Sequence, residues 1–580
     1  MRSTLLCLLL TAPAAASTLY VSASAPPGGS GTSWSSPYND LQLALAVATS
    51  GDEIRISQGT YKPALPGGPR TATFSIPIGV TLRGGFAGPA SPTPDDRNIT
   101  LYVTTLSGDL NGNDGANFSN MAENSFHIVT ITAGSASTGL DGLTIRSGFT
   151  GGVGNTTGGA GLRATNCSPT IIDCTFTNND GQTGGGGGAF LSNFFGDITR
   201  CTFRANRSQT QGGGLHVSGS GPHVTDCLFE SNIGGSGAGV FSTNASDGTY
   251  TRCTFKTNLG QIGSSSGAGF YENVATSWLK SCTFIRNTTG GGGGALFCAG
   301  APLTQVQNCS FIANQGTADG GGAIYTTNAL CHTVFTNCFF TGNRSDLASG
   351  TTLFAGPSAT VDITSCTIVN SGAGQGFGAI RGANSTIRIY NSVMAGNTNQ
   401  LGSGQGAQFS STLPTVIDHC LIQGWTGSLG GIANSGTLPN FIDLDGPDNI
   451  PGNEDDNAHF LPGSPRIDAA ANNWLNATTF PTDIDGNPRF HDDPGTPDTG
   501  SGTAPIADIG CYEFQGTTCY GNCDLSQSPP LLTANDFQCF LNAFATGNPN
   551  ANCDGSTSNP TLTANDFQCF LNLFAQGCPV

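Results

Sequence analysis

The sequence of 580 residues predicts a mainly β fold: a right-handed parallel β-helix with an N-terminal capping helix, followed by a small α-helical module. Three observations predict this fold. A pattern Cys-x-Phe-x-x-Asn returns every 26 to 29 residues through the middle of the chain. Glycine-rich segments separate successive copies, and the stretch LTANDFQCFLN occurs twice near the C-terminus. We therefore divide the chain into residues 1–17, 18–425, 426–515 and 516–580.

The first region, residues 1–17, has the three parts of a secretory signal peptide. Arg2 is followed by an apolar run from Leu5 to Leu10 and by small residues at 14–16. A segment of this kind directs export, so we expect a secreted protein, extracellular or at the cell surface. No later run of 18 apolar residues follows, and no membrane-spanning helix is expected.

The capping helix is expected over residues 37–50, PYNDLQLALAVATS. Its apolar residues recur at helical spacing, and it directly precedes the first strand that the sequence indicates, at residues 54–56. An open end of a stack of strands exposes both strand edges and core. We therefore expect this helix to cover the N-terminal end, before further early strands at residues 80–82 and 143–145.

The repeat defines three positions in each turn of the β-helix. The Cys and the Phe two residues later point to the same side of a strand, and we expect both to face inward. The Asn five residues after the Cys falls where the strand ends. There its tolerance of left-handed backbone angles and its amide suit a tight turn, and stacked Asn residues should form a ladder. The cysteines of this column are Cys174, Cys201, Cys227, Cys253, Cys282, Cys309, Cys338, Cys366 and Cys420.

A second strand is expected after each glycine-rich segment, at residues 188–190, 214–216, 269–271, 294–296, 322–324 and 378–380. So short a turn cannot bury its own apolar face, so neighbouring turns must stack at about 4.8 Å. Thirteen turns would give a rod roughly 60 Å long. We expect the column cysteines to be buried thiols that act as small hydrophobic residues; a disulfide or metal ladder is the alternative.

Two short motifs accompany the repeat. The segments FTNN (176–179), FRAN (203–206), FIRN (284–287) and FIAN (311–314) share the form FxxN, and GGAI (321–324) has the form GGA(I/L/V). In these motifs, residues 170–400 resemble the polymorphic outer-membrane proteins of chlamydiae. The resemblance implies a right-handed parallel β-helix surface protein and carries over no activity.

Catalysis is the open question for the β-helix. Pectate lyases and polygalacturonases share this architecture and use paired carboxylates, or a calcium cluster with an Arg or Lys base. Acidic residues between 170 and 425 are scattered, and none recurs at the same position in adjacent turns. Arg204 and Arg207 could meet Glu230 across neighbouring turns, which we interpret as a solvated ion pair. His216 and His223 are isolated and are expected to be structural or exposed.

Residues 441–513 form an acidic region with fourteen Asp or Glu residues and two Arg residues. Its densest part, DLDGPDNIPGNEDDN at 443–457, offers hard oxygen ligands around glycines, so calcium and a solvated acidic loop are equally good interpretations. The candidate calcium ligands are Asp443, Asp445, Asp448 and Asp455. The segments LPGSPRIDAA, TDIDGNPRF and APIADIGCYEF that follow resemble the choice-of-anchor end segment of bacterial surface β-helices, which implies a final coil and a cap.

The tail, residues 516–580, contains two units thirty residues apart, each a polar loop followed by an apolar stripe at helical spacing. Oxygen ligands at alternate loop positions with a closing carboxylate are typical of EF-hand-like calcium loops. The candidate ligands are Asn522, Asp524, Ser526 and Asp536 in the first unit and Asn552, Asp554, Ser556 and Asp566 in the second. From Asn522 to Asp536 the spacing is 14 where a standard loop needs 11.

The duplicated loop and helix resemble dockerin type I modules, in particular the cysteine-containing tails of planctomycete-type secreted proteins. The resemblance implies bound Ca²⁺ and docking to a cohesin-like partner. Six tail cysteines allow fifteen pairings; the symmetric choice joins Cys523 to Cys539, Cys553 to Cys569 and the two terminal cysteines. Disulfides would stabilise so small a core, and stability without a partner is the alternative role.

The function that the sequence favours is a secreted, non-catalytic cell-surface or matrix protein, whose β-helical rod for adhesion or binding is displayed through the dockerin-like tail. The alternative is a β-helical polysaccharide lyase or glycoside hydrolase that the tail recruits to a complex. A net charge of −18 argues against nucleic acid as a partner, because phosphate binding needs a basic patch. Polysaccharide is the ligand expected along the β-helix.

Overall fold

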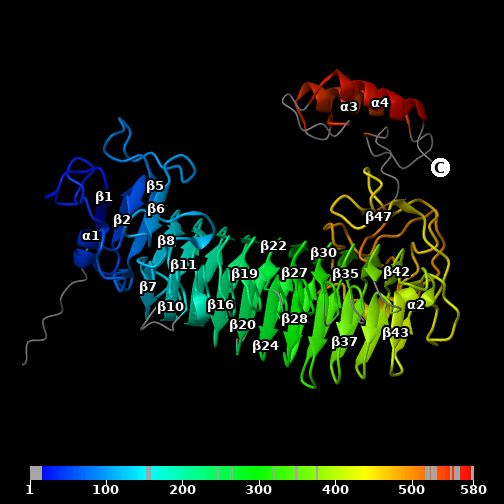
Figure 1. Cartoon of the computed structure of the whole chain (residues 1–580). Helices are drawn as coiled ribbons and strands as arrows, with labels where there is room; N and C mark the ends of the chain where they lie inside the picture. Colours follow the sequence, from blue (N-terminus) through cyan, green and yellow to red (C-terminus); the bar gives the residue numbers. More distant parts are fainter. Residues whose placement is uncertain are drawn as a thin grey trace, which may run out of the picture.

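The computed structural model describes residues 16–151, 158–244, 247–261, 263, 265–317, 320–346, 350–373, 377–515, 523, 532–548, 551–553 and 562–576. Most of the predicted signal peptide lies outside these residues. The strands of residues 18–422 stack along one axis as a parallel β-helix (Figure 1). The predicted solenoid of about thirteen turns is therefore confirmed.

Sheet A has 14 strands, all parallel. Its outward face carries the groove described below. The strands are β1 (Thr18–Val21), β2 (Glu53–Ser57), β5 (Thr81–Phe86), β8 (Gly139–Asp141), β11 (Thr170–Ile172), β14 (Asp197–Thr199), β17 (His223–Thr225), β21 (Gly248–Thr251), β25 (Thr276–Lys280), β29 (Leu303–Gln307), β33 (His332–Thr336), β37 (Thr360–Thr364), β41 (Thr386–Tyr390) and β44 (Val416–Asp418).

Sheet B has 13 strands and contains the phenylalanines of the repeat. It follows sheet A after a sharp turn in each coil. The strands are β3 (Gly59–Tyr61), β6 (Thr104–Ser107), β9 (Thr144–Arg146), β12 (Thr175–Thr177), β15 (Thr202–Arg204), β18 (Leu228–Glu230), β22 (Thr254–Lys256), β26 (Thr283–Ile285), β30 (Ser310–Ile312), β34 (Phe339–Thr341), β38 (Thr367–Val369), β42 (Val393–Ala395) and β45 (Leu421–Ile422).

Sheet C has 12 strands and contains the strands predicted after the glycine-rich segments. They are β4 (Phe74–Ile76), β7 (Val129–Thr132), β10 (Leu162–Cys167), β13 (Ala189–Phe194), β16 (Leu215–Ser218), β20 (Val240–Thr243), β24 (Phe270–Asn273), β28 (Leu296–Ala299), β32 (Ile324–Thr327), β36 (Leu353–Ala355), β40 (Ile380–Gly382) and β43 (Phe409–Ser411). Sheet D is a narrow ladder between B and C, made of β19 (Ile233–Gly234), β23 (Leu259–Gly260), β27 (Thr288–Thr289), β31 (Gln315–Gly316), β35 (Arg344–Ser345) and β39 (Gly372–Ala373).

The interior is packed by in-register columns, as the repeat predicts. Phe176 stacks on Phe203 with ring centroids 4.7 Å apart, and the stack continues through successive turns to Phe340. All nine column cysteines are buried and free, which confirms the prediction of buried thiols. Burial raises the pKa of the Cys420 thiol to about 12, so this thiol stays protonated in the core.

The asparagine ladder is also confirmed. From Asn179 to Asn314, each ladder amide donates to the amide oxygen of the Asn in the next turn, as from Asn232 Nδ2 to Asn258 Oδ1 at 3.0 Å. The residue with the left-handed backbone, however, is the one before each ladder Asn. In the turn of Asn258 it is Thr257, with φ 51°. The Asn side chain can therefore turn inward and bond to backbone groups, since the turn itself is made by its neighbour.

At the N-terminal end, helix α1 (Leu41–Val47) begins at the cap residue Asp40 and buries Leu41, Ala44 and Leu45. The predicted helix is thus confirmed in position. It does not precede the first strand, however, because β1 comes before it and pairs with β2. The helix is an insertion between two strands of sheet A, which lets its apolar side close the core.

At the C-terminal end, a short helix α2 (Gln405–Gln408) precedes β43, and Trp425 and Leu429 pack against the main core. The acidic region then lies along the side of sheet B. There Phe339, Val369 and Val393 share a second apolar core with residues of segments 458–471 and 507–512. The short antiparallel pair β46 (Phe441–Asp443) and β47 (Asn457–Phe460) belongs to this region.

Close backbone contact holds the acidic region, residues 441–513, against the solenoid. A Cβ atom at Gly342, whose φ is 62°, would lie 1.9 Å from the carbonyl oxygen of Gly452. Only two glycines allow the chains to approach this closely. The side chain of Asn370 donates to the Leu444 carbonyl oxygen at 2.6 Å and to the Asp456 carboxylate at 2.9 Å. The acidic region therefore packs against sheet B over the last turns, and residues 441–513 are called the acidic layer below.

The tail contains two helices, α3 (Ala534–Ala545) and α4 (Ala564–Gln576). Their apolar faces pack together, with Phe540 stacked on Phe570 at 4.1 Å. Disulfides join Cys523 to Cys539 and Cys553 to Cys569, as in the symmetric pairing. Among the described residues no helix is long and apolar enough to cross a membrane.

Candidate functional site

The main candidate site is a groove on the outward face of sheet A. Two neighbouring cavities of about 370 and 400 Å³ form it, and they share Val334, Thr336 and Phe480. Its floor is built from alternate residues of β25, β29, β33, β37 and β41, because side chains of a strand alternate between the two faces. The floor residues are Trp278, Lys280, Gln305, Gln307, Val334, Thr336, Asp362, Thr364, Arg388 and Tyr390.

Strand register places these floor residues in rows along the rod. Trp278 pairs with Gln305, Gln305 with Val334, Val334 with Asp362, and Asp362 with Arg388. Successive residues of a row are separated by the distance between neighbouring strands, about 4.8 Å. The groove therefore presents a regular array of side chains along five turns.

The wall of the groove comes from the distant loop 472–480. Trp474, in the short 3₁₀ segment Asn472–Trp474, stacks on Tyr390 with ring centroids 3.9 Å apart. The Gln307 amide donates to the Thr479 carbonyl oxygen at 3.3 Å. These contacts hold the loop over the floor. Trp278 at one end of the groove is 43% exposed, and Trp474 at the other end is 47% exposed.

Charged groups of both signs meet at this groove. Asp362 accepts hydrogen bonds from Arg388 and from His332, each at 2.8 Å. Lys280 lies at the end near Trp278. Exposed aromatic rings combined with planar amide and guanidinium donors can stack on and hydrogen-bond to a flat polar ligand. No pattern in the sequence indicates this groove, because its residues recur at no shared position of the repeat.

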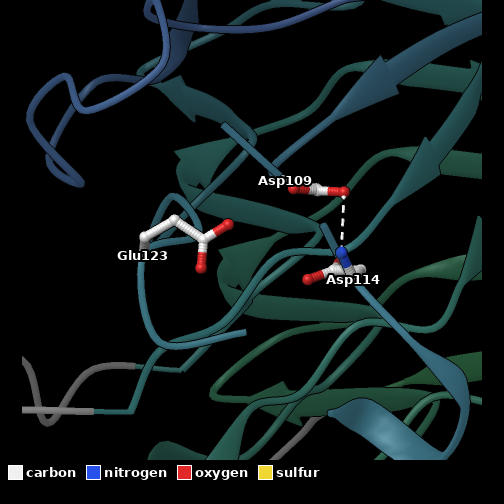
Figure 2. A group of neighbouring side chains, drawn as sticks. All are labelled: Asp109, Asp114 and Glu123. Atoms are coloured by element: carbon white, nitrogen blue, oxygen red, sulfur yellow. Dashed lines mark hydrogen bonds between the residues drawn. The ribbon is translucent and has the colours of Figure 1, made fainter. Parts of the chain in front are cut away.

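A second candidate site lies where the loop between β6 and β7 folds back over the turns beside sheet B. Figure 2 shows Asp109, Asp114 and Glu123 from this loop, with their carboxylates turned toward one another. One oxygen from each lies within 4.8 Å of the others. Asp114 also lines a cavity of about 480 Å³, together with Arg146 and Phe118.

Local hydrogen bonds shape this acidic loop. The Asp109 carboxylate accepts from the backbone N–H groups of Gly112, Asn113 and Asp114, at 2.6, 3.1 and 3.3 Å. Burial raises the pKa of Asp114. Oε1 of Glu123 is buried and has no hydrogen-bond partner among the described residues. Such oxygen donors suit a hard cation such as Ca²⁺.

Sequence reasoning missed these three residues, although a signal was present. The segment DLNGNDG at 109–115 has oxygen-bearing side chains at alternate positions followed by a glycine. This is the same kind of pattern that indicates calcium loops in the tail. It lies in the insertion between the early strands, outside the repeats of residues 170–425.

The calcium ligands predicted at 443–455 lie in the acidic layer over sheet B. Burial raises the pKa of Asp443, and the neighbouring carboxylates of Asp445 and Asp455 raise it further. Asp448 instead accepts from the Asn453 amide at 2.9 Å. The four do not form one of the close carboxylate groups found in the described part of the chain. Calcium binding there remains a prediction.

The tail ligands fall partly outside the described residues, namely Asn522, Asp524, Ser526, Asp554 and Ser556. Asp536 and Asp566 are buried at the helix starts, where their carboxylates accept from the backbone N–H groups of Thr533 and Thr563 at 2.7 Å. They thereby act as helix caps. Asn552 lies in a short connection before the second loop. Their role as calcium ligands remains a prediction.

The expectation for the two arginines is confirmed for one of them. Arg204 pairs with Glu230 in the next turn at 2.7 Å, whereas Arg207 pairs with Asp180 in the preceding turn and not with Glu230. His216 is buried between aromatic rings, and burial lowers its pKa to about 4. None of these groups lies in the groove.

The match to a family model agrees with the fold. The family described as right handed beta helix region matches residues 109–311 and 187–353. The crystal structure of pectate lyase Pel9A aligns with 13% sequence identity and a TM-score of 0.34, covering 86% of this chain and 96% of that chain. A rhamnogalacturonan lyase aligns with 10% identity and a TM-score of 0.31, covering 77% and 97%. No curated protein sequence matches this chain.

Proposed function

We propose that this protein acts outside the cell and binds a polysaccharide in the groove of sheet A. The observation that carries the proposal is the pair of exposed rings, Trp278 and Trp474, at the two ends of one continuous groove. Amide, hydroxyl and charged side chains lie between them. A polysaccharide offers flat ring faces for stacking and hydroxyl groups for these donors and acceptors. In this proposal the rod is a binding surface.

The first test replaces the exposed ring on the floor. Trp278→Ala should weaken binding to the recognised glycan about tenfold, because loss of one stacking contact costs about 1 kcal/mol and burial adds to it. The measurement is affinity electrophoresis in gels containing polygalacturonate, alginate or xylan. Phe195→Ala is the matched control, since Phe195 is 53% exposed and lies outside the groove. Equal binding by both variants, or no retardation of the wild type by any glycan, would contradict the proposal.

A lyase reaction is the second candidate function, because Arg146 lines the same cavity as Asp114 of the acidic loop. Asp109, Asp114 and Glu123 would hold a Ca²⁺ ion, which would neutralise the carboxylate of a uronic acid unit. Arg146, in its uncharged form, would take the proton from C5 of that unit and become a guanidinium. The C4–O bond would then break, its electrons leaving with the oxygen, which takes a proton from water, and a C4=C5 double bond would form.

If the protein is a lyase, we expect unsaturated sugar ends to appear when polygalacturonate is incubated with the protein and Ca²⁺. Arg146→Ala should abolish their formation, since the base is lost, and EDTA should do the same. Arg252→Ala is the control, because Arg252 lies on the surface in an ion pair with Asp226. Product formation that survives Arg146→Ala would refute this assignment, and absence of product from the wild type would leave binding as the function.

The tail completes the proposal. Residues 516–580 would attach the rod to a cohesin-like or other surface protein, with Ca²⁺ in the two loops. The repeated helices support this proposal, because they present two equivalent outer surfaces. Their phenylalanine stripes face each other across the helix pair, so a partner would contact the polar faces.

A further inference from the structure

We infer that the acidic layer over sheet B contains a divalent cation site formed by Asp468, Asp492 and Asp498, and that Ca²⁺ is its ligand. One carboxylate oxygen from each residue lies within 4.8 Å of the other two. This site differs from the predicted one at residues 443–455 and from the acidic loop at 109–123.

The burial and hydrogen bonding of the Asp468 carboxylate favour a bound cation. Its side chain is fully buried, yet Oδ1 has no hydrogen-bond partner among the described residues. Its second oxygen accepts only a long bond, 3.3 Å, from the backbone N–H of Asp493. A buried carboxylate oxygen without a partner is costly, and a bound cation would satisfy it.

The charge of this cluster also favours a cation, because Asp492 and Asp498 each place a carboxylate oxygen within 4.8 Å of one from Asp468. The ion pairs found in the described part of this layer use other carboxylates, as in Arg489 with Glu513 and His459 with Asp485. Three clustered carboxylates, one of them buried and none paired with a basic side chain in the part of the chain that the structure describes, match the oxygen donors that Ca²⁺ prefers.

The site would fasten the exposed loop 491–499 to the layer. Asp468 follows Ile467 of the apolar core, and its carbonyl oxygen accepts from the N–H groups of Thr499 and Gly500 at 2.9 and 3.0 Å. Asp492 and Asp498 lie on the loop itself and are exposed. A cation between them and Asp468 would therefore close the loop onto a buried anchor.

The test uses the full-length protein and Ca²⁺ alone as the probe. The double variant Asp492→Asn/Asp498→Asn changes only exposed side chains and is expected to fold. Equilibrium dialysis should give one Ca²⁺ fewer per chain than for the wild type. Hydrogen exchange of residues 491–499 should slow with Ca²⁺ in the wild type and not in the variant.

Asp197→Asn/Asp247→Asn is the matched control, because it removes two exposed carboxylates of the solenoid that belong to no proposed cation site. It should keep the effect of Ca²⁺ on residues 491–499. Equal Ca²⁺ stoichiometry for the wild type and the Asp492/Asp498 variant would overturn the inference. So would exchange of residues 491–499 that Ca²⁺ leaves unchanged in the wild type.

Discussion

At pH 8, Glu272→Gln is expected to be more stable than the wild-type protein, and the difference should vanish near pH 4. Glu272 is fully buried inside the solenoid on β24, where Thr304 of β29 donates to its carboxylate. Burial raises its pKa from the ordinary value of 4.5 to about 8. The side chain is therefore neutral in the folded protein at pH 6 and ionised in the unfolded chain.

The sign of the effect follows from proton linkage. Because the folded pKa is raised, the unfolded chain releases its proton first, and the contribution of Glu272 to stability is complete below pH 4.5 and lost as the pH rises to about 8. At 1.36 kcal/mol for each pH unit, the loss approaches about 5 kcal/mol as an upper bound. Glutamine cannot ionise, so the variant should escape this loss.

Urea unfolding at pH 4, 6 and 8, followed by circular dichroism, measures the difference in unfolding free energy between variant and wild type. Glu230→Gln is the control, because Glu230 is a surface residue in an ion pair with Arg204. It should change the free energy by less than about 1 kcal/mol. A difference for Glu272→Gln that does not grow with pH would show that Glu272 is ionised inside the solenoid.

Asn258→Ala is expected to lower the free energy of unfolding by about 3 to 6 kcal/mol, since it opens the asparagine ladder in its middle. The buried Asn258 amide makes four hydrogen bonds. Its oxygen accepts from the backbone and side chain of Asn232 at 3.1 and 3.0 Å. Its nitrogen donates to the Phe229 carbonyl oxygen at 2.8 Å and to Asn287 Oδ1 at 2.9 Å. Alanine removes all four bonds; Asn232 Nδ2 keeps its bond to the Phe203 carbonyl oxygen and Asn287 Oδ1 keeps the backbone N–H of residue 258, whereas the backbone N–H of Asn232 loses its acceptor.

The same unfolding measurement at one pH checks this prediction. Lys256→Ala lies two residues earlier, in the same turn, and points outward from β22, so it serves as the control. Its effect should stay within about 0.5 kcal/mol. If Asn258→Ala cost no more than Lys256→Ala, the ladder would contribute little to the stability of the solenoid.

The groove and the cation site could not be read from the sequence in the way that the solenoid could. Trp278 and Trp474 belong to segments far apart in the chain, and only the path of the acidic layer along sheet B brings loop 472–480 over sheet A. Likewise, the four acidic residues predicted to bind calcium at 443–455 do not make one of the close carboxylate groups of the described residues. Asp468, which the sequence did not single out, does belong to such a group, and its buried Oδ1 has no hydrogen-bond partner among the described residues.

The sequence by itself determined the solenoid: its period, its inward columns of Cys and Phe, and its asparagine ladder. These features follow from local rules, because each turn repeats the same alternation and meets the same neighbour one strand away. The tertiary structure alone decided where the insertions lie: α1 between two strands of sheet A, the loop of Asp109 beside sheet B, and the acidic layer along its side. These segments have no repeat to fix their neighbours, so their positions depend on packing between residues distant in the chain.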